Sequence, residues 1–182
     1  MNKKIIVLGS LIIDNVTYTE NVGEKGKTVF GKSFFQNIGG KGANQAMQIA
    51  KLQGDVLFLG ARGKDSLGDL ASSYLHQNGL RFYLKRVDEP TGVANVIVDT
   101  KNAQNQIIVV LGANETINEN DINFWSPKIL EGHIFISQLE TNVNASMYAL
   151  KFAKEHGLIT ILNPAPNREF DKKYLSFIDY II

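Results

Sequence analysis

The chain has 182 residues, a hydrophobic content of 44%, a formal net charge of +1 at pH 7 and no cysteine. Such a composition is typical of a globular chain that buries one good core, and the near-neutral charge argues against nucleic acid as its main partner. Without cysteines a disulfide framework and a thiolate metal site are excluded, and no feature indicates an oxidising compartment, so we expect a cytoplasmic protein.

The first predicted element is the apolar run from Ile5 to Ile13. The run is too short to span a bilayer, and it has no cleavage site that would indicate a signal peptide. Because strands buried on both faces are continuously apolar, the run predicts a buried parallel strand. Asp14 is then expected at the carboxyl end of that strand, where open α/β sheets place ligand groups. On position alone, an ordinary turn or capping aspartate is the favoured interpretation.

Three glycines, a lysine and an asparagine are concentrated in the segment Gly39 to Ala46. Glycine permits positive φ and lets backbone N–H groups approach a ligand. Apolar residues with helical spacing follow, which predicts a helix whose first amides point at the same place. A nucleotide P-loop is excluded, because Phe35 and Gly42 occupy the positions of its first glycine and its hydroxyl residue. A plain strand-to-helix turn and a binding site for a small polar ligand both remain open.

Strands and helices then alternate along the chain. Val56 to Gly60 predicts a second buried strand, and Leu67 to Leu75 has the spacing of a helix. Asp65 or Ser66 is the expected N-cap of that helix, and Gly79 is its expected end. This alternation predicts a parallel sheet with crossover helices.

An antiparallel insert interrupts the alternation. The segments Arg81 to Arg86, Gly92 to Val98 and Gln106 to Val110 are strand-like, with a polar hairpin turn at Lys101 to Asn105. Such an insert must cover another part of the molecule or pair with a second subunit.

The last third returns to the α/β pattern. Helices are predicted over Asn118 to Trp125 and around Ala145 to Ala153, and strands over Ile134 to Ile136, Ile159 to Leu162 and from Tyr180 onward. Glu140 and Asn163 each follow one of these strands, at the edge of the sheet where ligands bind. Without further information, a solvated glutamate and a rigid turn explain these two residues as well. The three histidines are scattered and have no metal-ligand spacing.

Gly39 to Ala46 resembles the first signature of the ribokinase family, the sugar and nucleoside kinases of the PfkB type. Other segments similar to that family follow in the family's order: Gly63 to Gly68, Thr91 to Ala94, Leu111 to Asn114, Gln138 to Glu140 and Leu162 to Pro166. The resemblance covers essentially the whole chain, and its specificity lies in the ordered set.

The resemblance implies a doubly wound α/β fold, with a mainly parallel sheet, helices on both faces and a small antiparallel β-sheet lid. Residues 1–182 would form one partial domain, with lid strands contributed by about 16–36 and 90–111, and the C-terminal half of the family fold would be absent. Family members often dimerise through the lid, so the resemblance also implies a homodimer. It gives no indication of a nucleic-acid or membrane partner.

The resemblance further implies a sugar site formed by a small set of residues: Asp14, Gly40, Lys41, Asn44 and Glu140. Glu140 is expected to contact a sugar hydroxyl or to hold Lys41, and Asn163 is expected near the path of the phosphate. One position departs from the family, because Ile12 stands where ribokinases usually carry an asparagine. This departure argues against ribose itself as the substrate.

The reaction implied is transfer of the γ-phosphoryl group of MgATP to the hydroxymethyl group of a pentose or related sugar, with a monovalent cation as a further cofactor. The family's catalytic base lies in a Gly-Ala-Gly-Asp segment, and Gly54-Asp55 and Gly68-Asp69 do not follow Gly-Ala. We therefore expect no catalytic residue and no metal ligand in this chain, and no turnover by the chain alone. The alternative is a non-catalytic sugar-binding or dimerisation fragment.

Overall fold

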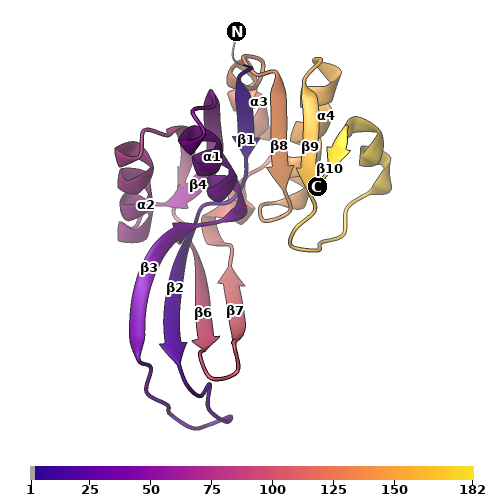
Figure 1. Cartoon of the computed structure of the whole chain (residues 1–182). Coiled ribbons are helices and arrows are strands. Elements are labelled where there is room, and N and C mark those ends of the chain that lie inside the picture. Colours follow the sequence, from indigo (N-terminus) through magenta and orange to yellow (C-terminus); the bar gives the residue numbers. More distant parts are fainter. Residues whose placement is uncertain (1–2) are drawn as a thin grey trace.

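The computed structural model describes residues 3–182, so the first two residues of the predicted 1–182 domain lie outside it. Two sheets organise the chain (Figure 1): a six-stranded main sheet and a four-stranded sheet that projects from one end of it. The main sheet has the order β10-β9-β8-β1-β4-β5, and all its neighbouring strands are parallel. The second sheet, which we call the lid, has the order β3-β2-β6-β7.

The main sheet consists of β1 (Ile5–Leu8), β4 (Val56–Gly63), β5 (Arg81–Val87), β8 (Ile134–Gln138), β9 (Ile159–Asn163) and β10 (Tyr180–Ile181). The lid consists of β2 (Ile12–Thr19), β3 (Ser33–Gly39), β6 (Gly92–Asp99) and β7 (Gln104–Val110). The helices are α1 (Lys41–Lys51), α2 (Ser66–Gln77), α3 (Glu119–Ile129) and α4 (Val143–Glu155), with short 3₁₀ turns η1 (Gly112–Thr116) and η2 (Lys172–Phe177).

Helices cover both faces of the main sheet, as the sequence predicts. Side chains alternate along β1, so Ile6 and Leu8 belong to one apolar cluster and Val7 to the other. The cluster of Ile6 and Leu8 is completed by α3 and α4, and the cluster of Val7 by α1 and α2. The doubly wound fold class is therefore confirmed.

The apolar run Ile5 to Ile13 is not one strand. It divides into β1 and the start of β2, which lie in different sheets, and the chain passes between the sheets at residues 9–11. The prediction of a single strand is wrong. It arose because Leu11 and Ile13, which lie beyond β1, are as fully buried as the residues of β1 itself. Burial keeps the sequence apolar where the chain changes sheets, so the pattern does not mark the crossing.

The lid contains one parallel pair, whereas an antiparallel sheet was expected. β2 pairs with β6 in parallel, from Ile12 opposite Gly92 to Thr19 opposite Asp99. The β2–β3 and β6–β7 pairs are antiparallel. Both β2 and β6 leave the main body and run outward, while β3 and β7 return to it (Figure 1). The lid thus begins at Ile12 rather than at about residue 16.

One buried asparagine ties together the two ends of the lid. The Asn114 side chain accepts a hydrogen bond from the Leu11 N–H at 2.9 Å and donates to the carbonyl oxygens of Leu11 at 2.9 Å and Leu111 at 2.8 Å. Leu11 directly precedes β2, and Leu111 directly follows β7. A single amide therefore fixes where the lid enters and leaves the main body.

Asp65 fixes a third connection to the lid. Its carboxylate caps α2 by accepting from the Gly68 N–H at 2.7 Å, and it accepts from the N–H and the hydroxyl of Thr91 at 2.8 and 2.6 Å. Burial alone would raise the pKa of Asp65, but these hydrogen bonds hold that pKa below its ordinary value. Because Thr91 precedes β6, the N-cap predicted from sequence also anchors the lid.

We expect Asn114→Ala to lower the free energy of unfolding by about 2–4 kcal/mol, because the Leu11 N–H and two carbonyl groups lose their partner in a buried place. The measurement is urea unfolding followed by circular dichroism. Asn78→Ala is the matched control, since Asn78 is exposed and its side chain donates to only the Tyr74 carbonyl; that change should cost less than about 1 kcal/mol. Equal losses in the two variants would contradict this role for Asn114.

Candidate functional site

A cavity of about 200 Å³ lies between the carboxyl edge of the main sheet and the lid. The cavity is lined by Ile12, Asp14, Gly40, Lys41, Asn44, Ala94, Val96, Ile107, Val109 and Glu140. All of the residues that the sequence proposed for sugar contact are among them. They come from β2, from the start of α1 and from the loop after β8, which are far apart in the sequence.

Glu140 joins these segments through its buried carboxylate. Its Oε2 atom accepts hydrogen bonds from the Lys41 N–H at 2.8 Å and from the Ser10 hydroxyl at 2.6 Å. Its Oε1 atom lies 3.4 Å from Lys41 Nζ. Lys41 is the first residue of α1, whose first N–H groups have no partner within the helix. A carboxylate at this position supplies that partner and interacts favourably with the helix dipole.

The glycines before α1 make room for neighbouring parts of the chain. A Cβ atom on Gly39 would lie 2.1 Å from Asp14 Oδ2, so only glycine lets that carboxylate approach the backbone. Gly40 has φ of +92°, and a Cβ there would lie 2.7 Å from the Ser10 carbonyl oxygen. The sequence predicted the need for glycine, and the structure gives a different reason for it.

Asp14 lies in the lid, as the third residue of β2, and not at the end of a main-sheet strand. Burial, with Glu140 nearby, raises the pKa of the Asp14 carboxyl above its ordinary value, and Lys41 partly offsets the effect. The carboxylate is therefore held in a place where its charge is incompletely compensated. Such an acceptor is ready for hydrogen-bond donors such as sugar hydroxyls.

The cavity has two chemically different walls. Asp14, Lys41, Asn44 and Glu140 form a polar wall with both donors and acceptors. The other wall is aliphatic, comes from the lid, and consists of Ile12, Ala94, Val96, Ile107 and Val109. A small ligand with a polar side and an apolar side fits this arrangement.

The sequence analysis missed two parts of the site, and one residue that it proposed for the phosphate path does not line the cavity. Ser10 was not proposed, although the turn that ends β1 places its hydroxyl against Glu140. The aliphatic wall was also missed, and the period-two pattern of the lid strands was the signal available for it. Asn163 ends β9 opposite Gln138 and does not line the cavity, so its role near the phosphate path remains a prediction.

Within residues 3–182, no group of three or more His, Asp or Glu side chains is arranged to hold a metal ion. In the same range, no helix has both the length and the apolar character needed to cross a membrane.

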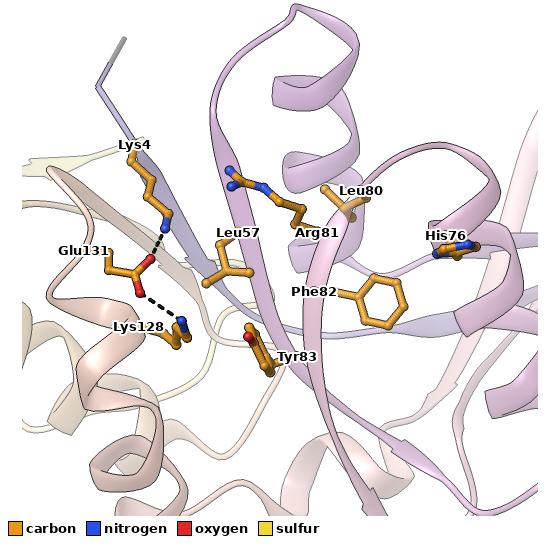
Figure 2. Close-up of a pocket in the computed structure, with 9 residues that line it drawn as sticks. All are labelled: Lys4, Leu57, His76, Leu80, Arg81, Phe82, Tyr83, Lys128 and Glu131. Atoms are coloured by element: carbon orange, nitrogen blue, oxygen red, sulfur yellow. Dashed lines mark hydrogen bonds and ion pairs between the residues drawn. The ribbon is translucent and has the colours of Figure 1, made fainter. Parts of the chain in front are cut away.

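A second cavity of about 380 Å³ lies at the amino edge of the main sheet (Figure 2). Figure 2 shows that Glu131 forms ion pairs with both Lys4 and Lys128. Arg81, which also lines the cavity, forms an ion pair with Asp55 outside it. Hydrogen bonds from the two lysines lower the pKa of Glu131 to about 2.

Comparison with known proteins agrees with this fold. Residues 2–182 match the family model described as pfkB family carbohydrate kinase. The chain is 36% identical to a ribokinase of Lactococcus lactis over 180 residues and 34% identical to a deoxyribokinase of Salmonella typhi over 181 residues. Each alignment covers 98% of this chain and 59% of the relative.

A solved structure of Arabidopsis thaliana ribokinase, complexed with ribose and ATP, superposes with a TM-score of 0.85 at 30% identity. That alignment covers 100% of this chain and 60% of the Arabidopsis chain. The fold is that of a carbohydrate-kinase type of α/β domain with a lid. The chain belongs to the pfkB family of carbohydrate kinases, and it spans about 60% of the length of the relatives it matches.

We expect Asp14→Asn to stabilise the ligand-free chain at neutral pH, because it removes a charge whose pKa is raised by burial and by Glu140. A raised carboxyl pKa means that the folded state binds the proton more tightly than the unfolded state. The gain in the free energy of unfolding of the variant is therefore complete above the folded-state pKa and disappears below the ordinary value of 3.8. Thermal unfolding of the unmodified chain and of Asp14→Asn from pH 3 to pH 7 measures this gain. A variant less stable at pH 7 would contradict the assignment.

Proposed function

We propose that this chain is the sugar-binding and lid part of a kinase that transfers the γ-phosphoryl group of ATP to the hydroxymethyl group of a pentose. The observation that carries the proposal is the cavity in which Asp14, Lys41, Asn44 and Glu140 meet beneath the lid. The similarity to ribokinase and deoxyribokinase, and to a ribokinase structure complexed with ribose and ATP, supports a pentose and ATP as the two substrates.

The residues of the chain act by binding and positioning. Asp14 accepts hydrogen bonds from a pair of neighbouring sugar hydroxyls, while Lys41 and Asn44 donate to others. Glu140 holds the start of α1, and with it Lys41, in place. The lid covers the sugar and limits access of water to it. Fixing the hydroxymethyl group in one orientation reduces the entropic cost of an in-line attack on phosphorus.

The alternative is a non-catalytic sugar-binding or dimerisation module. Because the sequence has no Gly-Ala-Gly-Asp segment, we expect this polypeptide alone to bind a sugar without consuming ATP. In this proposal magnesium and any monovalent cation belong to the complete kinase. A cytoplasmic location remains part of the proposal, on the grounds of composition.

The test is calorimetric binding of ribose, 2-deoxyribose, fructose, tagatose and nucleosides to this polypeptide, together with ATP consumption in the presence of each. We expect one pentose to bind, and Lys41→Ala to weaken its binding about tenfold or more through loss of a charged donor. Lys51→Ala is the matched control, because Lys51 ends the same helix and is exposed.

Unchanged affinity in the Lys41→Ala variant would remove Lys41 from the site. Binding of no sugar would contradict the proposed function, and ATP turnover by the chain alone would contradict the expected lack of a catalytic base. Circular dichroism of each variant separates loss of binding from loss of folding.

In the same proposal, two copies of the chain pair through the face of the lid that carries Asp14. Beyond the cavity this face continues with Val16, Tyr18, Phe35 and Val98. The Phe35 side chain is 45% exposed and stacks on Tyr18 with ring centroids 6.0 Å apart. The opposite face carries a hydrogen-bonded row of amides, Asn15, Gln36 and Asn95, next to the exposed Phe34 and Ile108. An exposed apolar face of this kind is typical of an interaction surface.

We expect light scattering to give the mass of a dimer for the unmodified chain and of a monomer for Phe35→Lys, because a buried lysine at the interface would be unpaired. Phe34→Lys is the matched control: Phe34 is the neighbouring residue on the opposite face, is 60% exposed, and should tolerate the charge. A monomeric unmodified chain, or equal effects of the two changes, would contradict pairing through this face.

A further inference from the structure

The loop after β9 holds the loop that carries Glu140 at two points. The Ala165 carbonyl accepts a hydrogen bond from the Leu139 N–H at 3.1 Å. The Arg168 guanidinium donates to the Thr141 carbonyl at 2.7 Å and to the Leu139 carbonyl at 3.3 Å. Glu140 lies between these two carbonyl groups in the chain. A single guanidinium therefore fixes the backbone on both sides of the carboxylate residue of the site.

Arg168 also contacts the base of the lid. Its Nη1 atom lies 2.8 Å from Glu115 Oε1, and the two side chains are 32% and 38% exposed. Glu115 directly follows Asn114, whose side chain bonds to Leu11 and Leu111 at the two ends of the lid. A guanidinium is planar and carries several donors in a fixed arrangement, so it can hold two partners at a defined distance. The partners here are the Glu140 loop and the anchor of the lid.

These contacts close into a circuit, which we call the contact ring. Starting from Glu140, the ring contains in order Ser10, Leu11, Asn114, Glu115 and Arg168. Two of its steps join chain neighbours, and the other steps are the hydrogen bonds and the ion pair given above. Each member is thus held from two directions. Loss of Arg168 would open the ring on both sides at once, at the lid anchor and at the Glu140 loop.

We propose that Arg168 is a positioning residue of the sugar site, which holds the Glu140 carboxylate, and with it Lys41, at a fixed place relative to the lid. The inference rests on the proposed function and adds to it a residue that does not line the cavity. Arg168 acts through the backbone of the Glu140 loop and does not touch the sugar. A site displaced by about 1 Å loses affinity even when all its binding side chains are present.

The first experiment measures amide hydrogen exchange of Lys41 in the ligand-free chain. The Lys41 N–H donates to Glu140, so its protection reports whether the carboxylate is in place. We expect Arg168→Ala to lower this protection about tenfold, and to leave the protection of Phe58, in the buried strand β4, unchanged. An equal loss at both amides would indicate general destabilisation, and no loss at Lys41 would show that Glu140 is held without Arg168. Either result overturns the proposal.

The second experiment is calorimetric titration with ribose and with 2-deoxyribose. We expect Arg168→Ala to weaken binding of the pentose that the unmodified chain binds roughly 3-fold to 30-fold. Arg168→Lys keeps the charge and loses the planar fork, so it should recover part of the lost affinity. Arg81→Ala is the matched control, because Arg81 forms an ion pair with Asp55 at the amino edge of the sheet. This control should change neither the affinity nor the exchange of Lys41.

Glu115→Gln tests the ring from the side of the lid. It removes the charge that pairs with Arg168 and leaves the contacts of Arg168 with the Glu140 loop. We expect a smaller loss of pentose affinity than in Arg168→Ala, in the same direction. In the double variant, Glu115→Gln should add nothing to Arg168→Ala, because the ring is already open. Additive effects of the two changes would contradict the contact ring.

The outcomes separate this inference from the proposed function. If neither pentose binds, the proposed function fails, while the exchange of Lys41 still decides whether Arg168 positions Glu140. If a pentose binds with the same affinity to the unmodified chain and to Arg168→Ala, the sugar site stands and the positioning role is overturned. A loss of affinity that Arg168→Lys does not reduce would overturn that role as well.

Discussion

The buried carboxylate of Glu140 is the contact on which the site depends. A buried charge is tolerated only when hydrogen bonds replace its water, and here the Ser10 hydroxyl and the Lys41 N–H do so on one oxygen. These partners come from the turn after β1 and from the first residue of α1, while Glu140 itself follows β8. One anion therefore joins two neighbouring strands and a helix at the carboxyl edge of the sheet. It also sets the position of the Lys41 side chain, which faces the cavity.

The site also requires that the lid keeps a fixed position relative to the carboxyl edge of the main sheet. Asn114 holds the start of β2 beside the end of β7, and Asp65 holds Thr91 at the start of β6. These contacts lie outside the cavity, yet they decide how far the aliphatic wall stands from the polar wall. The two walls of the cavity come from different parts of the fold: the main body supplies most of the charged groups, and the lid supplies the apolar surface. Asp14 is the exception, and its raised pKa reflects its position at the border.

The polar half of the site was predictable from sequence, and the apolar half was not. Asp14, Gly40, Lys41, Asn44 and Glu140 all line one cavity. They were proposed because their motifs resemble those of the ribokinase family, whereas position alone favours a turn residue at Asp14 and explains Glu140 equally well as a solvated residue. Ile107 and Val109 look like any other strand residues, so their place in the cavity depends on which face of the lid points inward. Ser10 has a single short hydroxyl, and nothing local shows that it meets a carboxylate 130 residues away.

The sequence by itself determined the alternation of strands and helices after the first apolar run, an N-cap of α2 at Asp65 or Ser66 and the existence of a lid hairpin, because each of these is set by local periodicity and local hydrogen bonds. The doubly wound class followed from the resemblance of its motifs to the family. Only the tertiary structure decided that the first apolar run divides between two sheets and that β2 and β6 run parallel. It also decided that Gly39 makes room for the Asp14 carboxylate. These features depend on contacts between residues distant in sequence, and burial gives the same apolar pattern whichever sheet provides it.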